Sequence, residues 1–230
     1  MPGWHLFPLR DRLADRLGLP VLLDNDANMM ALGEHRAAHP TRRHLVVVKT
    51  GRGIGSGVIS DGRLHRGARG SAGDISHVRV DEAAELPCSC GNIGCLETVA
   101  SGAAIAAALR GKGLAADSAT DILRLVENGE PHATTLVRQA GRDIGAVLAV
   151  VVNFFNPEAV ILGGALSGAQ PLVAAVRGML YERCLPMATS ELTINAAVCG
   201  PDAGLLGAGH AVLRRLIAAD GPPAPAAGRG

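Results

Sequence analysis

Three cysteines lie within eight consecutive residues, in the glycine-containing stretch Cys88-Ser89-Cys90-Gly91-Asn92-Ile93-Gly94-Cys95. Thiols at this spacing can turn back on one tetrahedral ion, and Zn²⁺ is the usual ion of thiolate-rich sites. A fourth ligand is needed, and His77, eleven residues before Cys88, is the best candidate nearby. Four protein ligands leave no position for a reacting water, so we expect a structural Zn²⁺ site. The alternative is three free buried thiols.

The composition excludes several classes of protein. The chain has 22 Lys+Arg against 21 Asp+Glu, and this near balance argues against a strongly basic nucleic-acid-binding surface. Aromatic residues make up 2% of it, too few for single-strand binding through base stacking. The most apolar stretch, 144–155, is well short of the roughly 20 residues that a bilayer requires. No secretion signal opens the chain, so we expect a cytoplasmic protein with no membrane contact.

Helix and strand signals alternate along the chain, which favours an α/β layered fold. The predicted strands are 21–23, 45–49, 55–60, 63–65, 159–162 and 192–198, with a hairpin turn at Asp61-Gly62. The predicted helices are 6–17, one beginning at Asp26, 98–109, 121–127, 134–153, 171–184 and 202–219. Asp26 occupies the position expected of a helix N-cap. The Gly- and Pro-rich tail, 220–230, is expected to be disordered.

Two further stretches have the residue types of a ligand site. In Gly51-Arg52-Gly53-Ile54-Gly55-Ser56-Gly57, alternate glycines let backbone N–H groups approach an anion or a sugar, although a glycine-rich β-hairpin explains them equally well. Asp24-Asn25-Asp26 lies between a predicted strand and a helix, at the end of an α/β sheet where ligands bind. An Asp there could accept the proton of a substrate hydroxyl, and helix capping is the alternative.

Two carboxylates lie close in sequence to the cysteine cluster. Asp74 comes three residues before His77, and Glu97 two residues after Cys95. Each alone is more often a solvated surface charge. Together with Asp24-Asn25-Asp26 they indicate a polar pocket suited to hydroxyl groups.

The order and spacing of these motifs resemble the ROK family, named for repressors, open reading frames and sugar kinases. The resemblance extends over nearly all of residues 1–219, and its cysteine-rich part is highly specific. It also includes further stretches outside the motifs above: Arg66-Gly67, 70–77, 152–158, 160–167 and 203–208.

The resemblance implies an actin-like ATPase fold, of the ribonuclease H-like and hexokinase type, whose two lobes close on a sugar. It implies one domain over 1–219, with the end of the small lobe and the hinge at 1–44, the large lobe at 45–205 and a C-terminal helix at 206–219. The implied sugar ligands are Asn25, Asp26, Asp74, His77 and Glu97. Asp26 is the general base in members that phosphorylate. The implied phosphate-side glycines are Gly51, Gly53, Gly55, Gly163 and Gly164, and the implied Zn²⁺ ligands are His77, Cys88, Cys90 and Cys95.

Four departures from the family pattern bear on activity. Family kinases carry an Asp-x-Gly-Gly-Thr loop for the ATP phosphates, and nothing before Asp24 provides it. Their Gly-Thr-Gly reads Gly51-Arg52-Gly53 here, and their Glu-x-Gly-His reads Asp74-Ile75-Ser76-His77. Their Glu-Asn-Asp reads Asp24-Asn25-Asp26, which keeps the implied base.

We therefore expect the sugar site to be kept and the phosphoryl-transfer machinery to be incomplete. The prediction is a sugar-sensing effector domain of a transcriptional repressor, lacking its N-terminal segment. It would read DNA only through a helix-turn-helix that this chain does not contain. The alternative is an ATP- and Mg²⁺-dependent hexose kinase of the glucokinase or N-acyl-hexosamine kinase type. A homodimer or tetramer is expected in either case.

Overall fold

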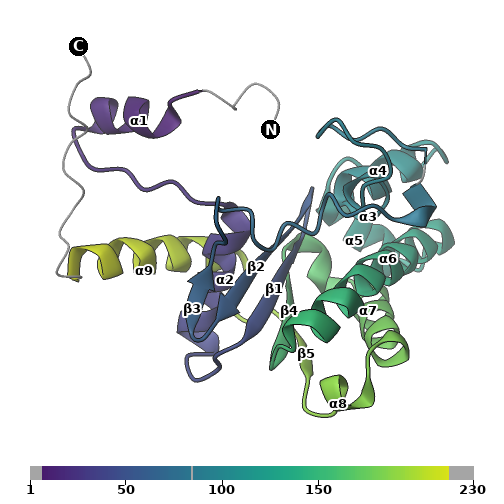
Figure 1. The fold of residues 1–230 in the computed structure, drawn as a ribbon. Helices are drawn as coiled ribbons and strands as arrows, with labels where there is room; N and C mark the ends of the chain where they lie inside the picture. The colour runs from purple at the N-terminus through teal and green to yellow at the C-terminus, as the bar shows by residue number, and fades with distance from the viewer. Residues whose placement is uncertain (1–6, 84, 218–230) are drawn as a thin grey trace.

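A five-stranded mixed sheet forms the centre of the molecule (Figure 1). The computed structural model describes residues 7–83 and 85–217. The strands are β1 (Leu45–Thr50), β2 (Ile54–Ser60), β3 (Arg63–His65), β4 (Ala159–Gly163) and β5 (Thr193–Ala196). Their order is β3-β2-β1-β4-β5, with β1, β4 and β5 parallel and the β1–β2–β3 meander antiparallel.

The described part of the chain contains nine α-helices, and most of them lie on the two sides of this sheet. They are α1 (Leu9–Leu17), α2 (Asp26–Ala38), α3 (Glu97–Ala100), α4 (Gly102–Arg110), α5 (Ala119–Glu127), α6 (Pro131–Phe155), α7 (Gln170–Arg183), α8 (Pro186–Thr189) and α9 (Ala203–Ile217). Helices α2 and α9 lie on one side of the sheet, and α3 to α7 on the other (Figure 1).

The alternation of side chains along β1 divides the core into two layers. Leu45 and Val47 join the smaller cluster beneath α2 and α9. Val46 and Val48 point the other way, into the larger cluster that α6 and α7 fill with aliphatic side chains. All four side chains are fully buried, as expected of a central strand covered on both faces.

Helices α2 and α9 pack so closely that their contact requires glycine. A Cβ on Gly33 would lie 1.9 Å from the carbonyl oxygen of Ala203. A Cβ on Gly207 would lie 1.8 Å from the carbonyl oxygen of Met29. The two glycines therefore allow direct backbone contact between the helices, and this contact fixes the first half of α9 against α2.

A buried carboxylate ties the chain before α9 to α2. Glu34 is fully buried, and its oxygens accept the backbone N–H groups of Val198 (3.0 Å) and Cys199 (2.7 Å). These two hydrogen bonds satisfy a charge that would otherwise be costly to bury.

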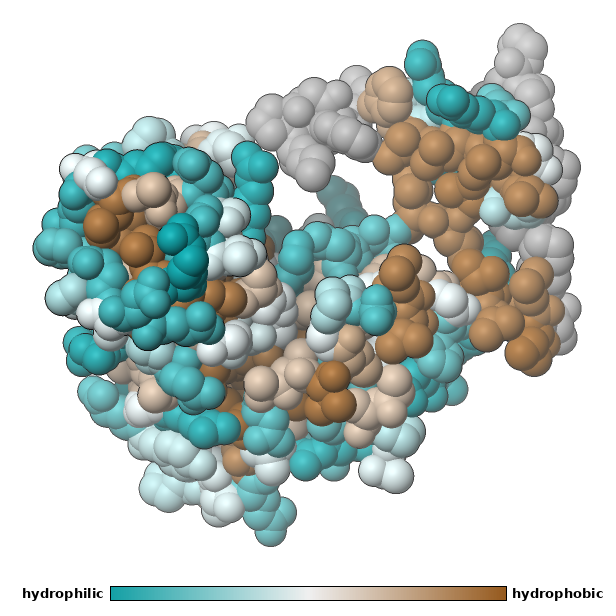
Figure 2. Space-filling model, turned by 180° about the vertical axis from the view of Figure 1, so that it is seen from behind, coloured by the Kyte–Doolittle hydropathy of each residue, from teal (hydrophilic) through white to brown (hydrophobic). Residues whose placement is uncertain are grey.

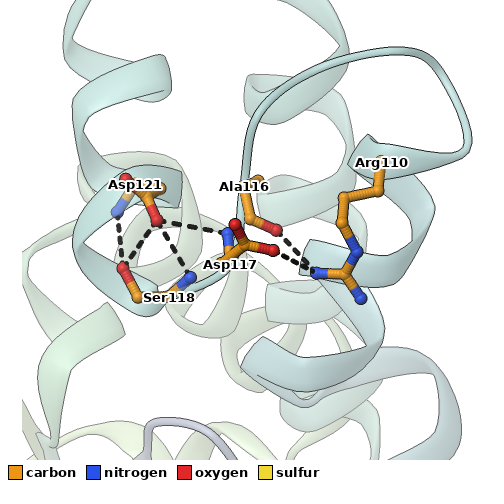
Figure 3. Close-up of polar contacts among 5 residues, drawn as sticks. All are labelled: Arg110, Ala116, Asp117, Ser118 and Asp121. Atoms are coloured by element: carbon orange, nitrogen blue, oxygen red, sulfur yellow. Dashed lines mark hydrogen bonds and ion pairs between the residues drawn. The ribbon is translucent and has the colours of Figure 1, made fainter.

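The connection between α4 and α5 is held by a capping box. The Ser118 hydroxyl accepts the backbone N–H of Asp121 (3.2 Å), and the Asp121 carboxylate accepts that of Ser118 (3.1 Å) (Figure 3). Arg110 reaches over from α4 and donates to the carbonyl oxygen of Ala116 (2.7 Å) and to Asp117 (3.4 Å).

The alternating elements predicted from sequence are confirmed, and several details are corrected. The hairpin at Asp61-Gly62 is present, and both residues have positive φ (53° and 69°), as its tight turn requires. Residues 21–23 are not a strand: no strand of the described chain pairs with them, and a strand needs a partner for its backbone groups. The helix predicted at 98–109 is divided at Ser101, whose backbone is extended and whose hydroxyl caps α4.

The C-terminal helix predicted at 202–219 is confirmed within the described residues. It is α9, which begins at Ala203, and the chain enters it from a short 3₁₀ turn, Gly200–Asp202. Residues 218–219 and the predicted disordered tail lie outside the described residues.

Large exposed apolar side chains gather on α9 and over α1 (Figure 2). A groove of about 1380 Å³ runs between α9, α2 and the chain before it, and Leu22, Leu23, Leu64 and Leu213 are among its lining residues. No helix in the described part of the chain is long and apolar enough to cross a bilayer.

Candidate functional site

The start of α2 presents Asp26 to solvent because its neighbour does the capping. Asn25, and not Asp26 as predicted, is the N-cap: its side-chain oxygen accepts the N–H groups of Ala27 (2.8 Å) and Asn28 (3.3 Å). The Asp26 side chain is 70% exposed, and its Oδ2 lies 2.5 Å from Nζ of Lys49. The carboxylate is thus held by an ammonium group at the end of β1 and stays open to a ligand.

Lys49 lies at the candidate site but was not predicted from the sequence. It interrupts the otherwise apolar strand Leu45–Thr50 one residue before its end, and that interruption is the signal that could have revealed it. Its register partner on the parallel strand β4 is Gly163, so both lie at the carboxyl edge of the sheet. Ligands bind at this edge in α/β folds.

Glu97 begins α3 and is fastened to the loop after β1. Its Oε2 accepts the backbone N–H of Ile54 (2.8 Å), and a Cβ on Gly53 would lie 2.8 Å from its Oε1. Burial raises the pKa of Glu97, and this effect outweighs the opposing contributions of the Ile54 N–H and of nearby His77. The charge of Asp74 also raises the pKa of Glu97 and that of Lys49 lowers it, so both side chains lie within electrostatic range of this carboxylate.

The departure at Ser76 gives Asp74 a partner. Asp74 Oδ1 accepts the hydroxyl (2.6 Å) and the backbone N–H (3.2 Å) of Ser76, whose side chain is buried. Glycine could not supply this hydroxyl. The shorter carboxylate and the serine therefore form one unit that fixes the direction of Asp74.

The four predicted metal ligands converge. The ligand atoms of His77, Cys88, Cys90 and Cys95 all lie within 4.8 Å of one another. Nδ1 of His77 is 3.5 Å from Sγ of Cys88, and Sγ of Cys90 is 3.7 Å from Sγ of Cys95. All three thiols are free, so no disulfide competes for them.

Backbone hydrogen bonds shape the loop that carries the thiols. The N–H of Cys88 donates to Asn92 (2.8 Å), and the N–H of Gly94 donates to Leu86 (2.8 Å). Gly91 and Gly94 have φ of 95° and 81°, which l-residues with side chains rarely adopt. The glycines between the cysteines thus allow the chain to turn back on itself.

The chemistry of this donor set fits a thiophilic divalent cation. Burial, together with the neighbouring thiols of Cys90 and Cys88, raises the pKa of Cys95 to about 12. The N–H of Asn92 lowers the pKa of Cys90. A tetrahedral ion such as Zn²⁺ would offset the cost of ionising Cys95 and would use all four side chains.

The loop Gly51–Gly53 packs against the start of α4. The carbonyl oxygens of Gly51 and Arg52 accept the N–H groups of Gly102 (2.9 Å) and Ala103 (2.9 Å). The first amides of α4 are therefore occupied by this loop. The glycine-rich β-hairpin that was one interpretation of this stretch is present as β1–β2.

Two of the remaining predicted glycines have clear packing roles. A Cβ on Gly55 would lie 3.1 Å from that of Ala27 in α2. Gly164 has φ of 82°, and a Cβ there would lie 2.5 Å from the carbonyl oxygen of Thr50. The Thr50 hydroxyl donates to Gly163 (2.9 Å), so the ends of β1 and β4 are joined beside the site.

Comparison with known proteins identifies the family. The sequence profile of the ROK family matches residues 1–215. The chain belongs to the ROK family. A glucokinase of Halalkalibacterium halodurans is 34% identical over 229 residues, which span 93% of this chain and 69% of that enzyme.

Solved ROK structures include both a kinase and a regulator. The Streptomyces griseus ROK glucokinase, in complex with glucose and AMPPNP, matches with a TM-score of 0.77 and 32% identity, over 89% of this chain and 72% of the enzyme. A ROK transcriptional regulator homologous to the E. coli MLC protein matches with a TM-score of 0.77 and 31% identity, over 87% of this chain and 53% of the regulator. The chain thus spans about half the length of that regulator. The predicted family is confirmed, and the fold matches the actin-like ATPase type of ROK sugar kinases.

Proposed function

We propose that this ROK chain binds a sugar at the carboxyl edge of its sheet and serves as the sugar-sensing domain of a transcriptional regulator. The observation that carries the proposal is the grouping of Asp26, Asp74 and Glu97 around Lys49 and His77. Each carboxylate is oriented by a protein donor. Fixed carboxylates accept hydroxyl hydrogens, and an ammonium group donates to hydroxyl oxygens, so the set is suited to a polyhydroxylated ring.

The four candidate metal ligands are consistent with the same site. With Zn²⁺ bound, the ion would contribute a rigid link between the loop 88–95 and the segment that carries Asp74 and His77. His77 would bind it through Nδ1, the atom nearest Cys88, which leaves Nε2 for a sugar hydroxyl. We expect the ion to be structural because four side chains complete its coordination.

Two observations favour sensing over phosphoryl transfer. The amides of Gly102 and Ala103, at the start of α4, already bond to the loop carbonyls of Gly51 and Arg52, so they are not available to a phosphate. Arg52 replaces the small hydroxyl of the family motif with a long, exposed cation. Sugar binding would then act by closing the cleft and changing the population of two conformations.

A sugar kinase is the second candidate, because the glucokinases described above are similar to this chain along most of its length. In this function, Asp26 accepts the proton of the sugar hydroxyl that attacks the terminal phosphate of ATP. ATP and Mg²⁺ would supply the transferred group and the charge that stabilises it. The exposure of Asp26 is compatible with both functions.

Calorimetry and turnover assays on the purified chain distinguish the two functions. Glucose and N-acetylglucosamine represent a plain and an N-acylated hexose, and the Asp26→Asn variant is the matched control. Binding without ATP turnover supports the sensor. Turnover that Asp26→Asn abolishes establishes the kinase and overturns the sensor. If neither sugar binds, both proposals fail.

A further inference from the structure

Asp24 connects the two segments that carry the proposed sugar ligands. Its Oδ1 accepts the backbone N–H of Asn25 (2.8 Å) and the side-chain amide of Asn28 (2.9 Å), at the start of α2. Its Oδ2 accepts both Nε (2.8 Å) and Nη2 (2.6 Å) of Arg66, in the loop after β3. The carboxylate thus binds donors from two parts of the chain about 40 residues apart.

These four hydrogen bonds leave Asp24 little capacity for a ligand. Its side chain is 17% exposed, whereas that of Asp26 is 70% exposed. Burial by itself raises the pKa of Asp24, but the hydrogen bonds from Asn28 and Arg66 outweigh it and hold that pKa below the ordinary value. Asp24 is therefore ionised and occupied by protein donors, whereas Asp26 is open.

Arg66 begins a closed loop that ends at Asp74. The carbonyl oxygen of Arg66 accepts the N–H of Ala72 (3.2 Å), and the N–H of Asp74 donates to Ser71 (3.3 Å). The Ser56 hydroxyl of β2 donates to the Gly73 carbonyl at the far end of the loop. The hydrogen bonds from Arg66 to Asp24 consequently hold one end of the segment that carries Asp74.

We propose that Asp24 and Arg66 are a pair of positioning residues that set the distance between Asn25-Asp26 and Asp74-Ser76-His77. This inference rests on the proposed sugar site, which it deepens. A sugar ring must be bound by both segments at once. Affinity therefore depends on their relative placement before the ligand arrives. Neither residue touches the sugar in this arrangement.

A double-mutant cycle on sugar binding tests the pair. Asp24→Asn keeps the shape but turns an acceptor into a donor facing Arg66, and Arg66→Met keeps the stem without the guanidinium. We expect each single variant to weaken glucose or N-acetylglucosamine binding about 10-fold. The double variant should bind the sugar no more weakly than either single variant. Arg66→Lys should restore only part of the loss, because one ammonium group does not reproduce two donors on one oxygen.

Arg110→Met is the matched control, because the Arg110 side chain is 48% exposed, as is that of Arg66. It removes a comparable ion pair far from the site in the α4–α5 connection and should leave sugar affinity unchanged. Wild-type affinity in Asp24→Asn and Arg66→Met, or losses that multiply in the double variant, overturns the proposal.

Hydrogen exchange gives a readout that needs no sugar. In both single variants the amides of Ala72 and Ser76 should exchange faster, whereas those of Cys88 and Gly94 in the metal loop should not change. If the wild-type chain binds neither sugar, the proposed function fails and exchange alone decides the positioning role. Unchanged exchange at Ala72 and Ser76 overturns that role.

Discussion

At the scale of single residues, adjacent side chains in this site have different tasks. Asp24 is saturated by protein donors, Asn25 caps α2, and Asp26 is left open beside Lys49. All three residues are polar and adjacent in the sequence, and their types alone do not separate these tasks. The three side chains have different roles because the backbone enters α2 at this point, so each of them points to a different set of neighbours.

Ser76→Ala tests whether the hydroxyl of Ser76 holds Asp74 in place. The variant removes a hydrogen bond to an ionised carboxylate, which is worth about 1.5–3 kcal/mol when formed in a protein. We expect sugar affinity to fall about 10-fold, with the zinc content unchanged. Titration calorimetry and metal analysis measure the two quantities, and full affinity in the variant would contradict the role given to Ser76.

Cys95→Ala tests the metal centre. Cys95 is almost fully buried, so its loss leaves three candidate donors and a cavity. We expect one equivalent of Zn²⁺ in the wild type, none in the variant, and a lower melting temperature. Cys184→Ala is the control, since that thiol is buried near the carbonyl of Ala149 and away from the cluster. Equal metal content in the wild type and the Cys95 variant would refute the assignment.

At the scale of elements, the contact between α2 and α9 depends on missing side chains. Gly207→Ala would place a Cβ 1.8 Å from the Met29 carbonyl and would force the helices apart. We expect the free energy of unfolding to fall by about 3 kcal/mol, as for other overpacked contacts. Gly209→Ala, on the same helix, meets no atom within 4 Å and should be neutral or stabilising by up to about 1 kcal/mol. Urea unfolding measures both, and equal stability of the two variants would contradict this packing.

The capping box of α5 has a pH dependence with a defined sign. The Ser118 hydroxyl first, then the N–H of Asp117 and the Arg124 guanidinium, lower the pKa of Asp121 from 3.8 to about 2. Because the folded pKa is the lower one, the ionised cap stabilises α5 fully above pH 3.8, and this contribution disappears as the pH falls through about 2. Carbon NMR titration of the Asp121 carboxyl group measures the midpoint. Ser118→Ala should raise it, and a wild-type midpoint near 3.8 would contradict the prediction.

At the scale of the whole molecule, apolar surface remains on α9 and α1 (Figure 2). Exposed apolar patches of this kind mark surfaces that associate. We therefore still predict a homodimer or a tetramer. Its mass would be two or four times the 23.5 kDa of one chain. Light scattering during size-exclusion chromatography measures this mass. A single-chain mass at micromolar concentration would contradict the expectation.

Much of the fold was predictable because its signals are local. Apolar runs alternate with stretches of helical spacing, and this pattern predicted the main strands and the helices around them. The dipeptide Asp61-Gly62 predicted the hairpin turn in which it lies. The strand predicted at 21–23 is wrong because strand formation is not a local property. The composition of these residues suits a strand, but a strand forms only where a second one supplies hydrogen bonds. Likewise, the apolar pattern of residues 98–109 does not indicate that Ser101 divides this segment into two helices.

The sequence by itself determined the family, the candidate metal ligands and the residue types of the proposed sugar site, because spacing within a short loop limits what its side chains can reach together. Only the tertiary structure decided that Lys49 binds Asp26 and that Asp24 joins Arg66. The contacts of Lys49 and Asp24 connect segments about 20 and 40 residues apart. Their geometry is set by the packing of α2 on the sheet, which no single stretch of sequence encodes.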